Sequence, residues 1–217
     1  MNEPPGWYAV ALGADLDAGT SAGTRLFGHE LVVWRDRAGA AHVWEDRCPH
    51  RGMRLSFGFV RGDHVACLYH GWRYDAAGRC RHIPAHPDLP VGPMIRATTF
   101  RSRERHGLVW VAWGDATDGA AAEDGAATPV RSLYLDAPAA HVRAELGAAP
   151  GPDGLVRARL AGLPALIAVQ PLSDVQCAVH VVLDGPAPAS DRIKAASACL
   201  GLRRAVEAAR AEPRSAP

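Results

Sequence analysis

Short apolar runs alternate with turn residues about every ten positions in the first half of the chain. Glycines at 39, 62 and 78 mark hairpin turns between such runs. This spacing is typical of a small antiparallel β-domain, in which loop tips are held on a rigid sheet. We expect strands at 7–12, 31–35, 41–45, 64–66, 73–74, 95–101 and 108–113.

The composition changes after Trp113. Positions 114–129 are rich in Ala, Gly and Asp without periodicity, which indicates a linker. Alternation then returns and predicts strands at 142–146, 156–160, 166–169 and 175–183, and apolar residues at helical spacing from 195 to 209 predict a C-terminal helix. We therefore expect a mainly β protein with a small antiparallel β-domain at 1–115, a linker at 116–130 and a small α+β domain at 131–217.

Composition and charge narrow the classes of function. The chain has 217 residues, of which 48% are hydrophobic, and a net charge of +1. It has neither an apolar stretch long enough to span a membrane nor a signal-like start, so we expect a cytoplasmic protein that binds neither membrane nor nucleic acid. Cys80, Cys177 and Cys199 are odd in number and irregularly spaced, and are interpreted as reduced thiols.

Two short segments each carry one thiol and one imidazole. Cys48 and His50 are followed, after sixteen residues, by Cys67 and His70. Two cysteines on one iron and two histidines on the other define a Rieske-type [2Fe-2S] centre. Glycines at 52 and 71 suit loops whose backbone amides approach the cluster sulfurs. These four residues are the candidate cluster ligands.

Two other interpretations of these residues remain open. Zinc sites of the Cys2His2 type pair like with like, whereas each segment here is mixed. Four unrelated buried residues would also have to account for the glycine that follows each pair. Both interpretations explain less of the pattern than an iron–sulfur cluster does.

Positions 45–90, EDRCPHRGMRLSFGFVRGDHVACLYHGWRYDAAGRCRHIPAHPDLP, resemble the Rieske domain of the Rieske non-heme iron oxygenases, as do Gly6-Trp7-Tyr8 and positions 104–111. The resemblance implies a Rieske-type cluster held by Cys48, His50, Cys67 and His70. Respiratory Rieske proteins carry an extra cysteine in each ligand loop, where this chain has Met53 and Tyr69. Without that disulfide we expect a potential in the lower part of the Rieske range.

The same family binds a mononuclear iron in its catalytic domain through a His-x(3–4)-His pair and a distant Asp. No such pair is present after the cluster region, where His141 and His180 are thirty-nine residues apart on expected strands. A facial triad draws its ligands from close positions, so we interpret both histidines as sheet-surface residues and expect no mononuclear Fe(II) in this chain.

Three hypotheses of function follow. In the first, the chain is an electron-transfer subunit that takes electrons from a reductase or ferredoxin and passes them to the mononuclear iron of a catalytic oxygenase subunit, in a trimer-based oligomer. In the second, it is a small self-contained monooxygenase that uses His141, His180 and Asp136 or Asp184. In the third, it is a non-catalytic module that senses redox state. The first accounts best for the residues.

Five arginines lie in or near the ligand loops: Arg47, Arg51, Arg54, Arg61 and Arg73. They predict either a positive surface for an acidic partner or, as the favoured interpretation, ion pairs with Asp46, Asp63 and Asp75.

Overall fold

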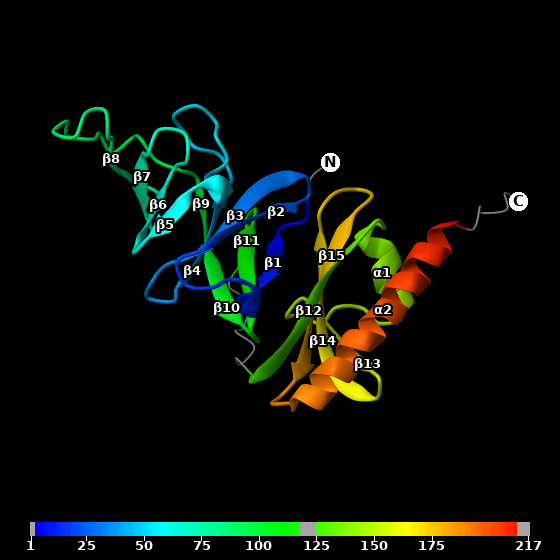
Figure 1. The fold of residues 1–217 in the computed structure, drawn as a ribbon. Coiled ribbons are helices and arrows are strands. Elements are labelled where there is room, and N and C mark those ends of the chain that lie inside the picture. Colours follow the sequence, from blue (N-terminus) through cyan, green and yellow to red (C-terminus); the bar gives the residue numbers. More distant parts are fainter. Residues whose placement is uncertain (1–2, 118–124, 212–217) are drawn as a thin grey trace, which may run out of the picture.

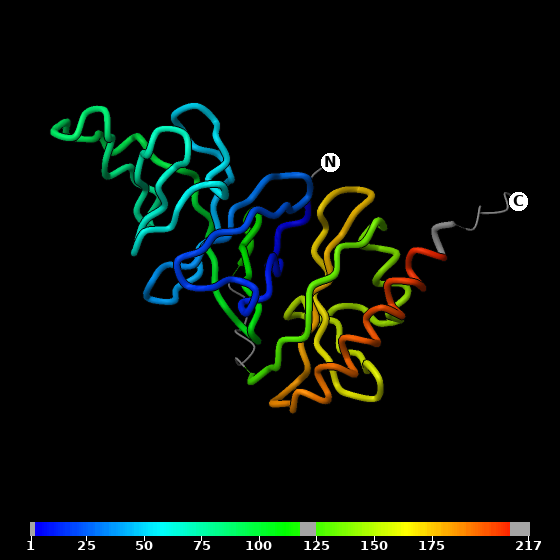
Figure 2. The backbone as a smooth tube through the Cα atoms, in the orientation of Figure 1, coloured from blue at the N-terminus to red at the C-terminus, as the bar shows by residue number. Residues whose placement is uncertain are grey.

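The computed structural model describes residues 3–117 and 125–211 and consists of four antiparallel sheets and two α-helices (Figures 1 and 2). Three sheets form the first half of the chain. Their strand orders are β1 (Gly6–Leu12), β11 (Leu108–Trp113), β10 (Ser102–Arg105); β2 (Ser21–Leu26), β3 (His29–Arg35), β4 (Ala41–Glu45), β9 (Thr99–Phe100); and β5 (Phe59–Arg61), β6 (His64–Ala66), β7 (Arg73–Asp75), β8 (Cys80–His82).

The second half of the chain forms the fourth sheet and both helices. Its strand order is β12 (Ala127–Leu135), β15 (Cys177–Asp184), β14 (Leu163–Pro171), β13 (Leu155–Leu160). The helices are α1 (Ala139–Leu146) and α2 (Ala189–Ala211), and α2 crosses one face of this sheet (Figure 1). None of the described helices is both long and apolar enough to cross a membrane.

Alternating side chains join the layers into one stack. In β11, Val109 and Val111 face the core shared with β3, whereas Leu108 and Trp110 face the fourth sheet. One face of the fourth sheet packs Val182 into the cluster that contains Trp110, and its other face packs against α2. Strands buried on both faces read as continuous apolar runs, as β11 does. The two halves of the chain therefore share an apolar core.

A second strand buried on both faces leads to the ligand loops. Leu31 and Val33 of β3 face the core shared with β11, and Val32 and Trp34 face the β5–β8 sheet. The β5–β8 sheet thus packs on a strand pair that is itself held from behind. It lies at the end of the molecule farthest from α2 (Figure 1).

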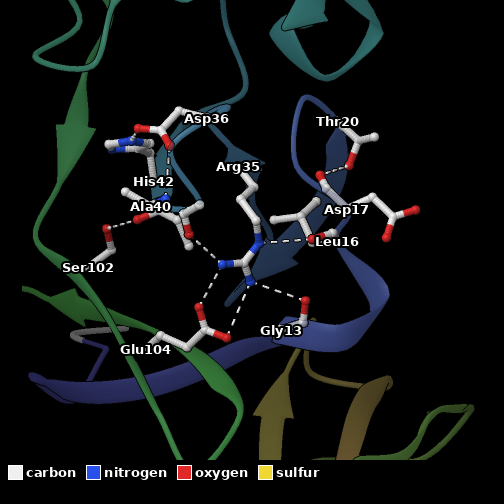
Figure 3. Close-up of polar contacts among 12 residues, drawn as sticks. Gly13, Leu16, Asp17, Thr20, Arg35, Asp36, Ala40, His42, Ser102 and Glu104 are labelled. Atoms are coloured by element: carbon white, nitrogen blue, oxygen red, sulfur yellow. Dashed lines mark hydrogen bonds and ion pairs between the residues drawn. The ribbon is translucent and has the colours of Figure 1, made fainter. Parts of the chain in front are cut away.

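Arg35 lies at the turn of the β3–β4 hairpin, at the end opposite to the one that leads to the first ligand loop (Figure 3). Its guanidinium donates to Gly39 O at 2.7 Å and to both carboxylate oxygens of Glu104, at 2.8 and 3.2 Å, while Nε donates to Leu16 O at 2.9 Å. The planar fork of arginine suits such bidentate pairing. One side chain thereby ties β3 to β10 and to the loop after β1.

Most of the predicted fold is confirmed, and several elements differ. Positions 142–146 are a helix, α1, because Val142 and Leu146 lie four residues apart in an alanine-rich segment that favours helix. Strand β12 begins at Ala127, inside the segment predicted as a linker. Strands β2, β5, β8, β10 and β12 were not predicted, and the strand expected at 95–101 forms only as β9. The rest of the expected linker, 118–124, lies outside the described residues.

His180 is not a sheet-surface residue. Its side chain lies on the face of β15 that meets the first half of the chain and is 1% exposed. Nε2 lies 2.8 Å from Gln170 Oε1, and Nδ1 lies 2.9 Å from Ser132 Oγ. Gln170 in turn donates to Thr24 Oγ1 at 2.9 Å. His180 is therefore part of a hydrogen-bond network between the two halves.

This network predicts a pH dependence of stability. Burial lowers the pKa of His180 to about 4, from 6.5. Below pH 6.5 the unfolded chain takes up a proton at this residue that the folded chain accepts only near pH 4, so stability is full above pH 6.5 and falls as the pH drops. The loss between pH 6.5 and 5 is about 2 kcal/mol, at about 1.4 kcal/mol for each unit.

Urea unfolding at pH 7 and pH 5 measures this loss. We expect His180→Gln to be less stable at pH 7 but to lose about 2 kcal/mol less than the wild type on acidification. The exposed His141 provides the control, since His141→Gln should keep the wild-type pH dependence. Equal losses in all three proteins would contradict the assignment.

Candidate metal centre

The two ligand loops have the same backbone design. In the loop after β4, Gly52 N donates to Cys48 O at 2.8 Å and Cys48 N donates to Met53 O at 2.8 Å. In the loop after β6, Gly71 N donates to Cys67 O and Cys67 N to Trp72 O, both at 2.9 Å. The glycines have φ of 73° and 69°, which side-chain-bearing residues rarely adopt. Each loop is thus a five-residue turn that begins at a cysteine and is closed by a glycine.

The structure brings the predicted ligands together in two pairs, the cysteines and the histidines. Cys48 and Cys67 are 2% and 3% exposed and share one apolar cluster. The rings of His50 and His70 lie 4.8 Å apart between centroids, with His50 half-buried and His70 exposed. The thiols therefore face inward and the imidazoles outward. The described residues contain no group of three or more His, Cys, Asp or Glu side chains placed to hold a single metal ion.

Aromatic rings cover both imidazoles. Trp72 stacks on His50 at 4.2 Å with an angle of 7° between planes, and Tyr69 packs on His70 at 3.8 Å. Both aromatic residues belong to the second loop, where Tyr69 directly precedes His70 and Trp72 follows it after Gly71. This packing restricts rotation of the rings and fixes which edge of each imidazole is presented.

The pKa shifts of His50 and Cys67 bear on how the site would bind a metal. Partial burial, with smaller contributions from His70 and Arg51, lowers the pKa of His50 and favours the neutral imidazole that metals bind. Burial raises the pKa of the Cys67 thiol. The backbone amides of Tyr69 and His70 donate to its sulfur and have the opposite effect, because they lower this pKa. Bound iron would replace that proton, and these amides would then stabilise the thiolate.

Tyr74 is a further site residue that the sequence interpretation did not identify. Its hydroxyl lies 3.2 Å from Cys48 Sγ, and its side chain is fully buried. When Cys48 is an iron-bound thiolate, only the phenol can donate in this pair. The sequence could have identified it, because consecutive side chains of a strand point to opposite faces. Arg73 is exposed, so Tyr74 points into the core.

The Tyr74 hydrogen bond should tune the redox potential. A hydrogen bond to a cluster sulfur withdraws electron density and favours the reduced state. A hydrogen bond worth about 0.5–1.5 kcal/mol corresponds to roughly 20–65 mV for a one-electron couple, so Tyr74→Phe should lower the midpoint potential by about that amount. Spectroelectrochemical titration measures it, with the exposed Tyr134→Phe as control; equal potentials in the two variants would contradict this role.

The alternative iron ligands considered in the second hypothesis do not converge. His141 is exposed on α1 and not on a strand, both ring nitrogens of His180 are engaged, and Asp136 Oδ1 accepts from Gln176 at 2.8 Å.

All five cysteines are buried and free of disulfide bonds. His86 is exposed, and His106 Nδ1 lies 3.2 Å from Gly125 O.

The five arginines near the ligand loops do not form the ion pairs that the sequence interpretation favoured. Asp46 accepts from Ser56, Asp75 pairs with Arg81, and Asp63 pairs with His64. Among the predicted five arginines, Arg54 pairs with Glu30, and Arg61 lies over the ring of Phe59. The carboxylates of Asp46, Asp63 and Asp75 are thus engaged elsewhere, which leaves Arg47, Arg51 and Arg73 on the surface.

Comparison with known proteins agrees with this geometry. Residues 6–93 match the family model of the Rieske [2Fe-2S] domain. The chain is 41% identical over 109 residues to oxidoreductase NdmD of Pseudomonas putida, covering 50% of this chain and 18% of that protein. It is 36% identical over 110 residues to the oxygenase component of 3-ketosteroid-9-alpha-monooxygenase of Rhodococcus rhodochrous, covering 51% and 28%. The matched segment therefore spans less than a third of either relative.

The fold of the whole chain has solved counterparts. Apo dicamba monooxygenase superposes with a TM-score of 0.74 at 19% identity, over 94% of this chain and 85% of that one. NdmB of Pseudomonas putida CBB5 gives a TM-score of 0.70 at 19% identity, over 93% and 81%. At this identity the likeness concerns the fold. Residues 6–93 are a Rieske [2Fe-2S] domain, in a chain related to components of Rieske oxygenases.

Proposed function

We propose that this protein is a Rieske-type electron carrier, which receives electrons from a reductase or ferredoxin and passes them to the mononuclear iron of a partner oxygenase chain. The observation that carries the proposal is the arrangement of two buried thiols behind two outward imidazoles on twin loops. This donor set fits the mixed ligation of a Rieske cluster. Cys48, His50, Cys67 and His70 would hold it.

When bound, such a cluster accepts and releases one electron at a time. The protein contributes a dry inner side, where Cys48 and Cys67 pack among apolar residues, and an accessible outer side at His70. Tyr74 and the amides of Tyr69 and His70 would then donate toward the thiolate sulfurs, while Trp72 and Tyr69 pack on the imidazoles. Electrons would therefore enter and leave at the edges of the imidazoles, where a partner can approach.

The names of the relatives support a role in an oxygenase system, since several are termed oxygenase components or monooxygenases. Such components work beside electron-donating proteins. The organisation proposed for this chain places the dioxygen chemistry on a second polypeptide, and a trimer-based assembly would bring the two irons close.

A potentiometric titration of the anaerobic holoprotein tests the carrier function. We expect a reversible one-electron transition in the lower part of the range of roughly −150 to +300 mV found for Rieske centres, because the loops lack a stapling disulfide. An irreversible transition, or a midpoint in the upper part of that range, would contradict the proposal. Product formation with a reductase alone would instead favour the self-contained monooxygenase.

A further inference from the structure

The surface around the two imidazoles is apolar at its centre. Leu68 and Tyr69, in the second ligand loop, are 48% and 53% exposed, and Pro49 of the first loop is also exposed. Tyr69 packs directly on His70, so this apolar area adjoins the ring that a partner would have to reach. Exposed apolar side chains gathered at one point are typical of interaction sites.

A third loop extends this surface. Pro84, in the segment that follows β8, lies against Gly71, where a Cβ would come within 3.1 Å of Pro84 Cγ. Val91 and Ile95 from the same segment pack on the apolar cluster that contains both thiols. Positions 47–53, 67–73 and 83–95 therefore form one surface, which we call the cluster face. It lies at the end of the molecule away from α2 (Figure 1).

The cluster face is positively charged although the whole chain is almost neutral. Its three segments contain Arg47, Arg51 and Arg73 but a single acidic residue, Asp88. All three arginines are exposed, and none has an ion-pair partner within 4.0 Å among residues 3–117 and 125–211. Asp46, at the base of the first loop, is buried and accepts hydrogen bonds from Ser56, so its carboxylate does not form an ion pair with these arginines.

We propose that the cluster face is the docking site of an acidic electron-donor protein, with Arg47, Arg51 and Arg73 steering the encounter and Leu68 and Tyr69 packing at its centre. The inference rests on the proposed carrier function and adds the chemistry of the partner. A rim of one charge around an apolar centre raises association rates and fixes orientation, while the centre supplies contact area. One electron would then pass from the donor's reduced cofactor to the oxidised cluster that the two cysteines and two histidines would hold.

The test compares two triple variants with the same change of net charge. The first is Arg47→Glu/Arg51→Glu/Arg73→Glu on the cluster face. The control is Arg159→Glu/Arg192→Glu/Arg204→Glu, which alters three exposed arginines on β13 and α2. An acidic plant-type [2Fe-2S] ferredoxin is the probe. Calorimetry measures the equilibrium affinity of the ferredoxin for this protein with both proteins oxidised. Stopped flow measures the rate at which the reduced ferredoxin reduces the cluster. Both are measured at several salt concentrations.

For the wild type we expect both affinity and rate to fall as salt rises. The cluster-face variant should lose at least about tenfold in affinity and rate at low salt and should no longer slow down with added salt, whereas the control should stay within about twofold of the wild type. A Leu68→Ser variant should weaken affinity while keeping the salt dependence.

Equal behaviour of the two triple variants would overturn the docking site. Self-association of the wild type that the cluster-face substitutions abolish, with ferredoxin binding unchanged, would assign the face to a second copy instead and also overturn it. An unchanged EPR spectrum of the dithionite-reduced variants shows that the cluster is intact. Failure of the carrier function is seen separately, as the absence of a reversible one-electron transition in the wild type.

Discussion

Replacing His70 with alanine is expected to abolish the Rieske-type absorption and EPR spectra while the β-sheet content is retained. His70 is the most exposed of the four proposed ligands, and without it the iron assigned to the two histidines would keep a single protein ligand, His50. Loss of residues that merely support a ligand weakens metal binding about 10- to 100-fold, so loss of the ligand itself should reduce the retained iron by at least tenfold. Because His70 is exposed, its removal should cost little folding energy.

Three further variants sharpen this result. His86→Ala, which removes an exposed histidine of the neighbouring loop, should leave iron content and spectra unchanged. His70→Cys should keep a cluster with an altered spectrum, because a thiolate replaces the imidazole. His50→Ala should behave as His70→Ala does. A wild-type spectrum from His70→Ala would remove this histidine from the ligand set.

The second large effect concerns the core shared by the two halves of the chain. Trp110 is 1% exposed, packs against Leu166 and Val182 of the fourth sheet, and donates from its indole nitrogen to Arg105 O at 3.1 Å. Truncating a buried tryptophan to alanine costs about 3–5 kcal/mol through lost burial and the cavity left behind. We expect Trp110→Ala to lower the free energy of unfolding by that amount.

Chemical denaturation followed by circular dichroism measures this loss. Tyr134→Ala is the matched control, because Tyr134 is an aromatic residue of β12 whose side chain is mostly exposed. It should change stability by less than about 0.5 kcal/mol. A cost below about 1 kcal/mol for Trp110→Ala would mean that the two halves do not depend on this contact.

The ligand segments were predictable because their chemistry is local. A cysteine, a histidine and a glycine within five residues favour a closed turn, and both turns form. In the structure Cys48 and Cys67 share one apolar cluster, and the rings of His50 and His70 lie close together. Their role as cluster ligands stays a prediction. The stacking of Trp72 on His50 links the two loops, so spacing alone could not reveal it. The same holds for the contact of Tyr74 with Cys48, which joins residues twenty-six positions apart.

The second half of the chain was harder to predict because its patterns were weak. The alternation of Val142, Ala144 and Leu146 fits a strand as well as a helix, and only the alanine-rich composition favours the helix that forms. His180 was interpreted as a sheet-surface residue because it lies on an expected strand with no nearby histidine that could complete a metal triad. Its face of the sheet is in fact covered by the first half of the chain, which is a tertiary contact that local pattern does not contain.

The central claim is that this chain binds a Rieske cluster through two cysteines and two histidines. Iron and acid-labile sulfide counted per chain on anaerobically purified protein, together with an EPR spectrum after dithionite reduction, test it most directly. The account predicts two irons and two sulfides for each chain and a Rieske-type signal that is lost in His70→Ala. Iron without sulfide, or zinc in place of iron, would contradict it.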